Sequence, residues 1–276
     1  MARTNTLGNF RTDVASAIRE KKGTTDTILA SNFDTEIASI EGGVDINEYL
    51  SDTITKGTSS SGGWVKTIIK LRSPLTVEGT SAEYMFYGCP LNELPQLDTS
   101  NVKDMTSMFD GCKNLTTIPQ IDTSNVTRMN QMFYQCSNLT TIPQIDTSKV
   151  NSMTYMFNGC NSLTTIPQLN GEKISILPSA FSGCKSLENF NGLINLGQEY
   201  LTTQSANYDY YKLVLTSSTL LTEQSIINIL NNLYDIKTKG CNAQQVVLGS
   251  TNLAKLTSEE GQQALSNAQA KGWTIS

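Results

Sequence analysis

The sequence predicts an α/β solenoid of stacked 24-residue strand–helix repeats, preceded by a small helical hairpin. Three features recur with this period, apart from one deletion between Cys89 and Pro95: a cysteine, a Met-Phe pair and a proline. They are Cys89, Cys112, Cys136, Cys160 and Cys184; Phe86, Phe109, Phe133 and Phe157, each after Met, then Ala180-Phe181; and Pro95, Pro119, Pro143 and Pro167. One unit cannot bury an apolar stripe alone, but stacked units form a continuous core.

Each repeat divides into two halves. The first, "NLTTIPQI", contains β-branched residues and ends at a proline, which predicts a short strand. The second, "DTSNVTRMNQMFYQC", predicts a helix, because its apolar residues are spaced as on one helical face. That face carries Val126, Met129, Met132, Phe133 and Cys136. Asp98, Asp122 and Asp146 precede these helices and are expected to cap them.

The C-terminal part, residues 207–276, predicts longer strand–helix units that close the open end of the core. Strands are expected at residues 213–215, 246–248 and 273–275, and a helix at residues 223–234. Thr257 and Glu260 have the spacing of a capping box, which predicts the start of a second helix.

The N-terminal 43 residues predict two short helices with apolar stripes. The stripes are Phe10, Val14 and Ile18 in the first helix, and Phe33, Ile37 and Ile40 in the second. A hairpin of this size needs a partner. We expect it to attach the protein to a particle or to oligomerise, and the alternative is a cap folded onto the solenoid. Residues 44–63 are expected to be a linker, and residues 64–206 to hold a first strand (64–71) and the repeats.

Composition excludes several classes of function. The formal net charge of −5 and the lack of basic patches argue against nucleic acid and anionic membranes. No apolar run is long enough to span a membrane, and no signal peptide is recognised, so we expect assembly in the cytoplasm. The chain has no histidine, which removes the commonest general base and zinc ligand. We therefore expect no enzyme, no cofactor and no metal.

The cysteine and aspartate columns each have two interpretations. The cysteines are expected to be buried free thiols, and the alternative is a disulfide framework, although five cysteines cannot pair evenly. The aspartates are expected to form caps and turns, and the alternative is a calcium ladder.

The exposed polar columns are the candidate ligand site. They are Thr116, Thr140 and Thr164; Thr117, Thr141 and Thr165; and Gln96, Gln120, Gln144 and Gln168. Such a neutral strip has the hydrogen-bonding groups to bind carbohydrate. The alternative is that the columns only solvate the surface and brace neighbouring strands.

The stretch "LTTIPQIDTSNVTRMNQMFYQC" resembles the BspA-type leucine-rich repeats of bacteria, over about residues 75–194. This resemblance implies a right-handed leucine-rich-repeat solenoid and a role in surface adhesion or binding. The C-terminal units resemble those that close such arrays in prophage-encoded proteins of Gram-positive bacteria. The stretch "AIREKKGTTDTI" resembles an N-terminal segment of phage tail and baseplate-associated proteins.

Together these resemblances predict a phage, prophage or tail-like particle protein that recognises a host surface at the tail or baseplate. Its expected location is the virion, where residues 1–43 would contact other virion proteins in a homo-oligomer, and a host-surface glycan is the expected ligand. One alternative is a capsid decoration or head fibre without a receptor. Another is a bacterial BspA-like surface adhesin.

Overall fold

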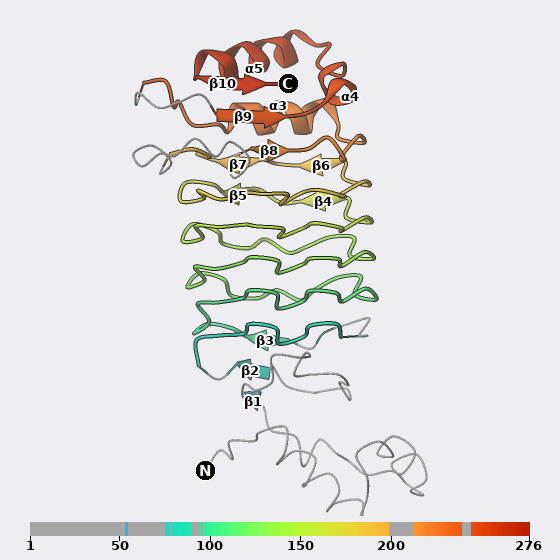
Figure 1. Ribbon diagram of the computed structural model, residues 1–276, viewed down its shortest axis with the longest axis vertical. Helices are drawn as coiled ribbons and strands as arrows, with labels where there is room; N and C mark the ends of the chain where they lie inside the picture. The colour runs from blue at the N-terminus through green and yellow to red at the C-terminus, as the bar shows by residue number, and fades with distance from the viewer. Residues whose placement is uncertain are drawn as a thin grey trace, which may run out of the picture.

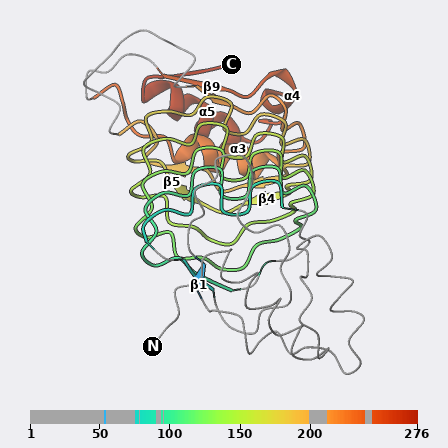
Figure 2. The ribbon, with the colours of Figure 1, turned by 60° about the horizontal axis from the view of Figure 1, so that its bottom comes forward.

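The computed structural model describes residues 53–54, 75–77, 79–89, 94, 96–198, 212–238 and 244–276. From residue 79 to residue 198 the described chain winds into coils that stack along the long axis of the molecule (Figure 1). We call this part the coil stack. Neighbouring coils pair in parallel 24 residues apart, as Thr165 does with Asn189 and Leu169 with Leu193. Figure 2 shows that successive coils have nearly the same outline.

The strands of the coils are short. They are β2 (Leu75–Val77), β3 (Leu97–Asp98), β4 (Thr165–Ile166), β5 (Leu169–Asn170), β6 (Asn189–Phe190) and β7 (Leu193–Ile194). With β1 (Thr53–Ile54), the sheets follow the orders β1-β2-β3, β4-β6 and β5-β7, and isolated parallel bridges such as Thr141 to Thr165 continue them. The strand predicted in the first half of each repeat is therefore confirmed at β4.

The range predicted to be a linker, residues 44–63, contains a short strand. β1 (Thr53–Ile54) lies inside that range and pairs in parallel with β2, so that Thr53 faces Thr76. The sheet therefore begins before the predicted first strand. That strand, over residues 64–71, and the two N-terminal helices lie outside the described residues.

The helix predicted in the second half of each repeat is wrong for the described coils. Residues 124–136 form successive turns. The amide of Met132 donates to the carbonyl of Met129 in its own coil, whereas the amide of Phe133 donates to Met156 in the next coil. Gln131 and Gln135 have φ angles of 56° and 57°, which a right-handed helix does not contain. The backbone amides thus alternate between hydrogen bonds within a turn of their own coil and hydrogen bonds to the neighbouring coil.

A column of phenylalanines forms the centre of the core. The rings of Phe109 and Phe133 are stacked with centroids 5.5 Å apart and planes inclined by 8°. The column runs from Phe86 to Phe181, and Phe190 closes it at a tilt of 39°. The methionine before each of the first four rings is also fully buried. The predicted core positions are therefore confirmed although the predicted helix is not.

The five cysteines in the described residues are free and buried, which confirms the expectation of structural thiols. Each of four thiols donates to the carbonyl of a phenylalanine in the preceding coil, for example Cys136 Sγ to Phe109 O at 3.0 Å. Burial raises the pKa of Cys112 and Cys184 to about 12, and that of Cys136 and Cys160 well above the usual range.

These thiols are expected to resist alkylation in the folded protein. Because the thiolate is the reactive species, we expect iodoacetamide to label Cys112, Cys136, Cys160 and Cys184 at least about a hundred-fold more slowly than in denaturant. Peptide mapping by mass spectrometry after timed labelling at pH 8 measures each site. Rapid labelling of Cys136 in the folded protein would contradict the buried column.

One carboxyl group, that of Asp110, is buried in a turn of the coil stack, at 8% exposure. Burial raises its pKa to about 6. The folded state therefore favours the protonated acid. The contribution of this group to the stability of the fold falls as the pH rises from about 4 to about 6. Asn158 occupies the equivalent position two coils later, which makes asparagine the natural replacement.

We expect Asp110→Asn to stabilise the protein by about 1 kcal/mol at pH 8, where the buried carboxylate is charged, and to have little effect at pH 4, where it is protonated. The expected gain is small because solvent screens part of the buried charge. Urea unfolding at the two pH values measures this. Asp122→Asn is the control of opposite sign, because hydrogen bonds from Ser124 lower the pKa of the exposed Asp122. A stabilisation by Asp110→Asn that is equal at both pH values would contradict the assignment.

A cap of helices and a sheet covers the C-terminal end of the stack (Figure 1). Its elements are β8 (Leu213–Val214), α3 (Glu223–Asn231), β9 (Gln244–Val247), α4 (Ser250–Leu253), α5 (Glu259–Ala270) and β10 (Trp273–Ile275). The strands pair in parallel in the order β10-β9-β8. The predicted strands and the first predicted helix are thus confirmed, although α3 ends at Asn231 rather than at residue 234.

The predicted capping box at α5 is wrong by one residue. The N-cap is Ser258, whose side chain accepts from the amide of Gly261, rather than Thr257. Glu223 of α3 accepts hydrogen bonds from the amides of Thr257 and Ser258, at 2.8 Å each. The start of α5 is therefore tied to α3, which joins these two helices of the cap.

Candidate ligand-binding groove

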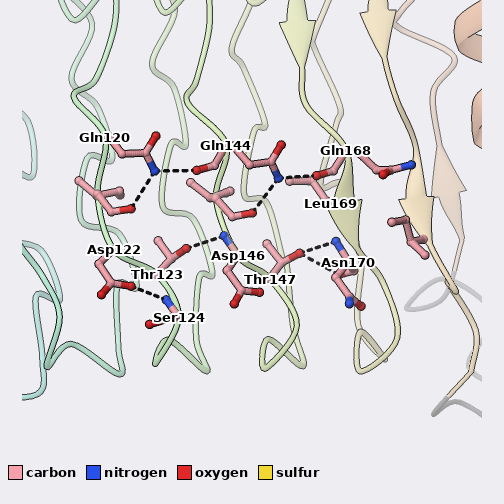
Figure 3. Close-up of a pocket in the computed structure, with 13 residues that line it drawn as sticks. Gln120, Asp122, Thr123, Ser124, Gln144, Asp146, Thr147, Gln168, Leu169 and Asn170 are labelled. Carbon is pink, nitrogen blue, oxygen red and sulfur yellow. Dashed lines mark hydrogen bonds between the residues drawn. The ribbon is translucent and has the colours of Figure 1, made fainter.

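An open groove of about 670 Å³ runs along one side of the coil stack and crosses four successive coils (Figure 3). It is lined by residues 120–124, 144–147 and 168–170 and by Ile194. We call it the axial groove. Because equivalent positions of successive repeats line it, its chemical groups recur at the spacing of the coils, which is about 4.8 Å where strands pair.

A column of glutamines forms one wall of the axial groove. The Nε2 atom of Gln120 donates to the backbone oxygen of Gln144 at 2.9 Å, and that of Gln144 donates to the backbone oxygen of Gln168 at 2.7 Å. Among the described residues, no hydrogen bond engages the side-chain oxygens of Gln120 and Gln144, which point to the same side in Figure 3. This wall therefore offers a row of acceptors.

Buried threonines connect the coils beneath the groove. The hydroxyl of Thr99 donates to the carbonyl of Asp122 at 2.7 Å, and that of Thr123 accepts from the amide of Asp146 at 2.7 Å. Thr147 both donates to and accepts from the backbone of Asn170, at 2.8 Å in each case. All three threonines are at most 3% exposed. Sequence reasoning missed this column, because buried and exposed threonines look alike in the repeat.

The aspartate column forms the opposite wall. Asp98, Asp122 and Asp146 each accept, through Oδ1, the amide of the serine two residues later. The aspartates thus close turns, as predicted, but they cap no helix. Hydrogen bonds from Ser100 and Ser124 lower the pKa of Asp98 and Asp122, so these exposed groups carry negative charge at neutral pH.

Only part of the predicted ligand site lies in the groove. Gln120, Gln144 and Gln168 line it, whereas no member of the two predicted threonine columns does. The hydroxyls of Thr140 and Thr164 donate to backbone carbonyls of the preceding coil, at 3.0 and 3.2 Å. This outer column braces the coils. The other five predicted positions do not line the groove. Thr116, Thr117, Thr141 and Gln96 are exposed, and Thr165 is half-buried.

The predicted attachment residues lie outside the described part of the chain. They are Phe10, Val14, Ile18, Phe33, Ile37 and Ile40. Among the described residues, no group of three or more histidines, cysteines or acids is arranged to hold a metal ion. Within the same residues, no helix has the length and apolar character to cross a membrane.

Comparison with known proteins finds one family that is similar to the repeat segment. Residues 80–194 match the profile of a family described as "Mycoplasma protein of unknown function, DUF285". The match coincides with the coil stack and covers less than half of the chain. The repeat segment is thus similar to a bacterial repeat family related to BspA-like surface proteins. No curated protein and no solved structure shows significant similarity to the chain. The N-terminal resemblance to phage tail proteins has no counterpart in these comparisons.

Proposed function

We propose that this chain is a non-catalytic recognition protein, in which a leucine-rich-repeat solenoid presents the axial groove to an extended polar ligand on a bacterial surface. The observation that carries the proposal is the repetition of acceptors along the groove. Gln120 and Gln144 supply amide oxygens, and Asp122 and Asp146 supply carboxylates, one of each in successive coils. A long ligand can then make the same contact several times.

We further propose that the protein belongs to a phage or phage-tail-like particle, in the tail or baseplate, and is attached through residues 1–43 as an oligomer. The resemblance of "AIREKKGTTDTI" to tail-associated proteins supports this. Several copies on one particle would add weak single-site affinities through their high effective concentration. The groove suits this arrangement. An open site binds each ligand weakly, so its overall affinity increases when several copies bind at once.

Cell binding tests the role of the groove. Full-length protein labelled with a fluorophore is applied to a panel of Gram-positive bacteria, beside the variants Gln144→Arg and Thr141→Arg. Gln144→Arg places a bulky side chain in the groove, whereas Thr141→Arg makes the same change on an exposed strand position outside it. We expect bound fluorescence to fall at least about ten-fold for the first variant only. Equal binding by both variants would overturn the proposal.

Particle association tests the role of residues 1–43. Phage-like particles from the producing culture are purified by density gradient and analysed for this chain by mass spectrometry. We expect the native chain to co-purify with particles. We expect a triple variant with Asp at Phe10, Val14 and Ile18 to stay in the soluble fraction while it still binds cells. Absence of the native chain from every particle fraction would refute the particle role and leave the groove untouched.

A bacterial surface adhesin is the second candidate. The match of residues 80–194 to a bacterial repeat family favours it. Labelling of intact producing cells with antibodies against the chain distinguishes the two roles, because an adhesin is found on the producing cell itself.

A further inference from the structure

The glutamine column stops at Gln168, and the reason is steric. The next position in the column is Gly192, where a Cβ atom would lie 2.9 Å from Asn232 Nδ2 and 3.0 Å from the carbonyl oxygen of Asn228. The end of α3 occupies that space, so no side chain can follow. Within the described residues, no hydrogen bond engages the side-chain amide of Gln168, and in Figure 3 it points onward beyond Gln144.

A second cavity, of about 320 Å³, begins where the glutamine column ends. Five residues line it, and all of them carry a carboxamide: Gln168, Asn191, Asn228, Asn231 and Asn232. We call them the carboxamide cluster. Gln168 lines both cavities, so the cluster continues the axial groove across the junction with the cap.

The cluster keeps free hydrogen-bonding groups. Asn232 Nδ2 donates to the backbone oxygen of Asn191 at 2.9 Å, and Asn228 Oδ1 accepts from Gln224 at 3.1 Å. The side chain of Asn231 has no hydrogen bond within the described residues, and its backbone oxygen accepts from Lys271 Nζ at 3.0 Å. The amides of Gln168 and Asn231 are therefore open to a ligand, with a donor and an acceptor each.

These groups indicate the charge of the ligand. Among the described residues, neither cavity is lined by lysine or arginine, and Asp122 and Asp146 bring negative charge to the groove. A polyanion would meet repulsion from these carboxylates, and the two cations beside the site lie outside its lining: Lys149 acts on Asp122, and Lys271 is bonded to the backbone oxygen of Asn231. A cationic chain would find carboxylates in the groove but only neutral amides in the cluster. Hydroxyl groups, which donate and accept, suit the acceptors of the groove and the amides of the cluster alike.

The spacing of the polar groups agrees with this chemistry. The groups of the groove recur about every 4.8 Å along the stack, close to the length of one sugar unit in an extended polysaccharide. Ile121, Ile145 and Leu169 lie between the polar walls but are at most 2% exposed, so the polar side chains of the walls carry the contacts to a ligand. The backbone amides of Asp146 and Asn170 are already bonded to threonine hydroxyls, so these two amides are not available to pair with a peptide strand.

From these observations we infer that the axial groove and the carboxamide cluster form one site for a neutral polysaccharide chain, and that Gln168 and Asn231 determine its specificity at the cap end. The inference rests on the proposed function, whose ligand it names by class. In this site, the chain lies along the stack axis with its hydroxyls on the glutamine and aspartate walls, and its leading sugar enters the cluster.

Binding of defined oligosaccharides tests the inference with the full-length protein. The neutral probes are oligomers of glucose, galactose, mannose and N-acetylglucosamine. Oligogalacturonate and a lysine oligomer are the acidic and basic probes. The variants are Gln168→Ala, Gln168→Ala with Asn231→Ala, and a control with Asn138→Ala and Gln269→Ala, which removes two exposed carboxamides elsewhere. Thermal unfolding verifies that every variant is folded.

We expect at least one neutral series to bind, and the charged probes not to bind. Gln168→Ala should weaken that binding about five-fold and the double variant about twenty-fold, with no change in the control. Binding of the double variant at the native level, with loss in Gln144→Arg, overturns the specificity role while the groove function stands. Binding by a charged probe alone, or by no neutral probe, overturns the ligand class. If Gln144→Arg also leaves cell binding intact, the proposed function fails as well.

Discussion

Replacing Phe133 with alanine is expected to lower the free energy of unfolding by about 3–5 kcal/mol. Phe133 is fully buried and stacks on Phe109 at 5.5 Å and on Phe157 at 5.6 Å. Its removal leaves a cavity inside the core, where the rigid coils on both sides limit collapse. Loss of the ring therefore weakens two interfaces between coils at once.

Urea unfolding followed by circular dichroism measures the effect. Leu220→Ala is the control, because Leu220 is 52% exposed and its truncation should cost under about 1 kcal/mol. A loss below about 1 kcal/mol for Phe133→Ala would show that the phenylalanine column does not hold the coils together.

Replacing Gly192 with alanine is expected to destabilise the protein by about 2–4 kcal/mol, because the cap can no longer dock without distortion. Gly192 has a φ angle of +86°. A Cβ there would also lie 3.0 Å from the carbonyl oxygen of Asn228 and 3.2 Å from the Cα of Ile229, which are backbone atoms that cannot swing aside. Strain and steric overlap therefore act together.

Gly88→Ala separates the two causes. Gly88 also has a positive φ angle, of +64°, but nothing lies within 4 Å of an added Cβ. This variant should show only the backbone strain, about 1 kcal/mol. Differential scanning calorimetry compares the two proteins. Equal destabilisation by both variants would mean that the contact between Gly192 and α3 contributes nothing.

The sequence predicted the coil period and the buried columns well, because both depend on periodicity alone. It failed on local conformation. Val126, Met129 and Met132 have the spacing of a helical face, but successive turns bury the same positions. The positive φ angles that interrupt a helix fall on Gln131 and Gln135. Glycine marks the position of Gln135 in other coils, as Gly111, Gly159 and Gly183, a signal that the helix prediction overlooked, whereas no glycine marks the position of Gln131.

The candidate site was predicted in part for a similar reason. The glutamine column lies at a repeated position and was visible in the sequence. The carboxamide cluster was not visible in the sequence, because its residues are far apart in the chain. Gln168 and Asn191 belong to two coils, and Asn228, Asn231 and Asn232 belong to the cap. Only the docking of α3 against Gly192 brings these distant segments together.

Hydrogen exchange of the full-length protein tests the central claim, that the axial groove is the ligand-binding surface. Exchange is measured with and without saturating carbohydrate from the surface of a bacterium that the protein labels. We predict slower exchange at residues 120–124, 144–147 and 168–170 of the groove and at residues 191 and 228–232 of the carboxamide cluster, with the neighbouring segment 137–141 unchanged. Protection of residues 137–141 with no change in the groove would contradict the account.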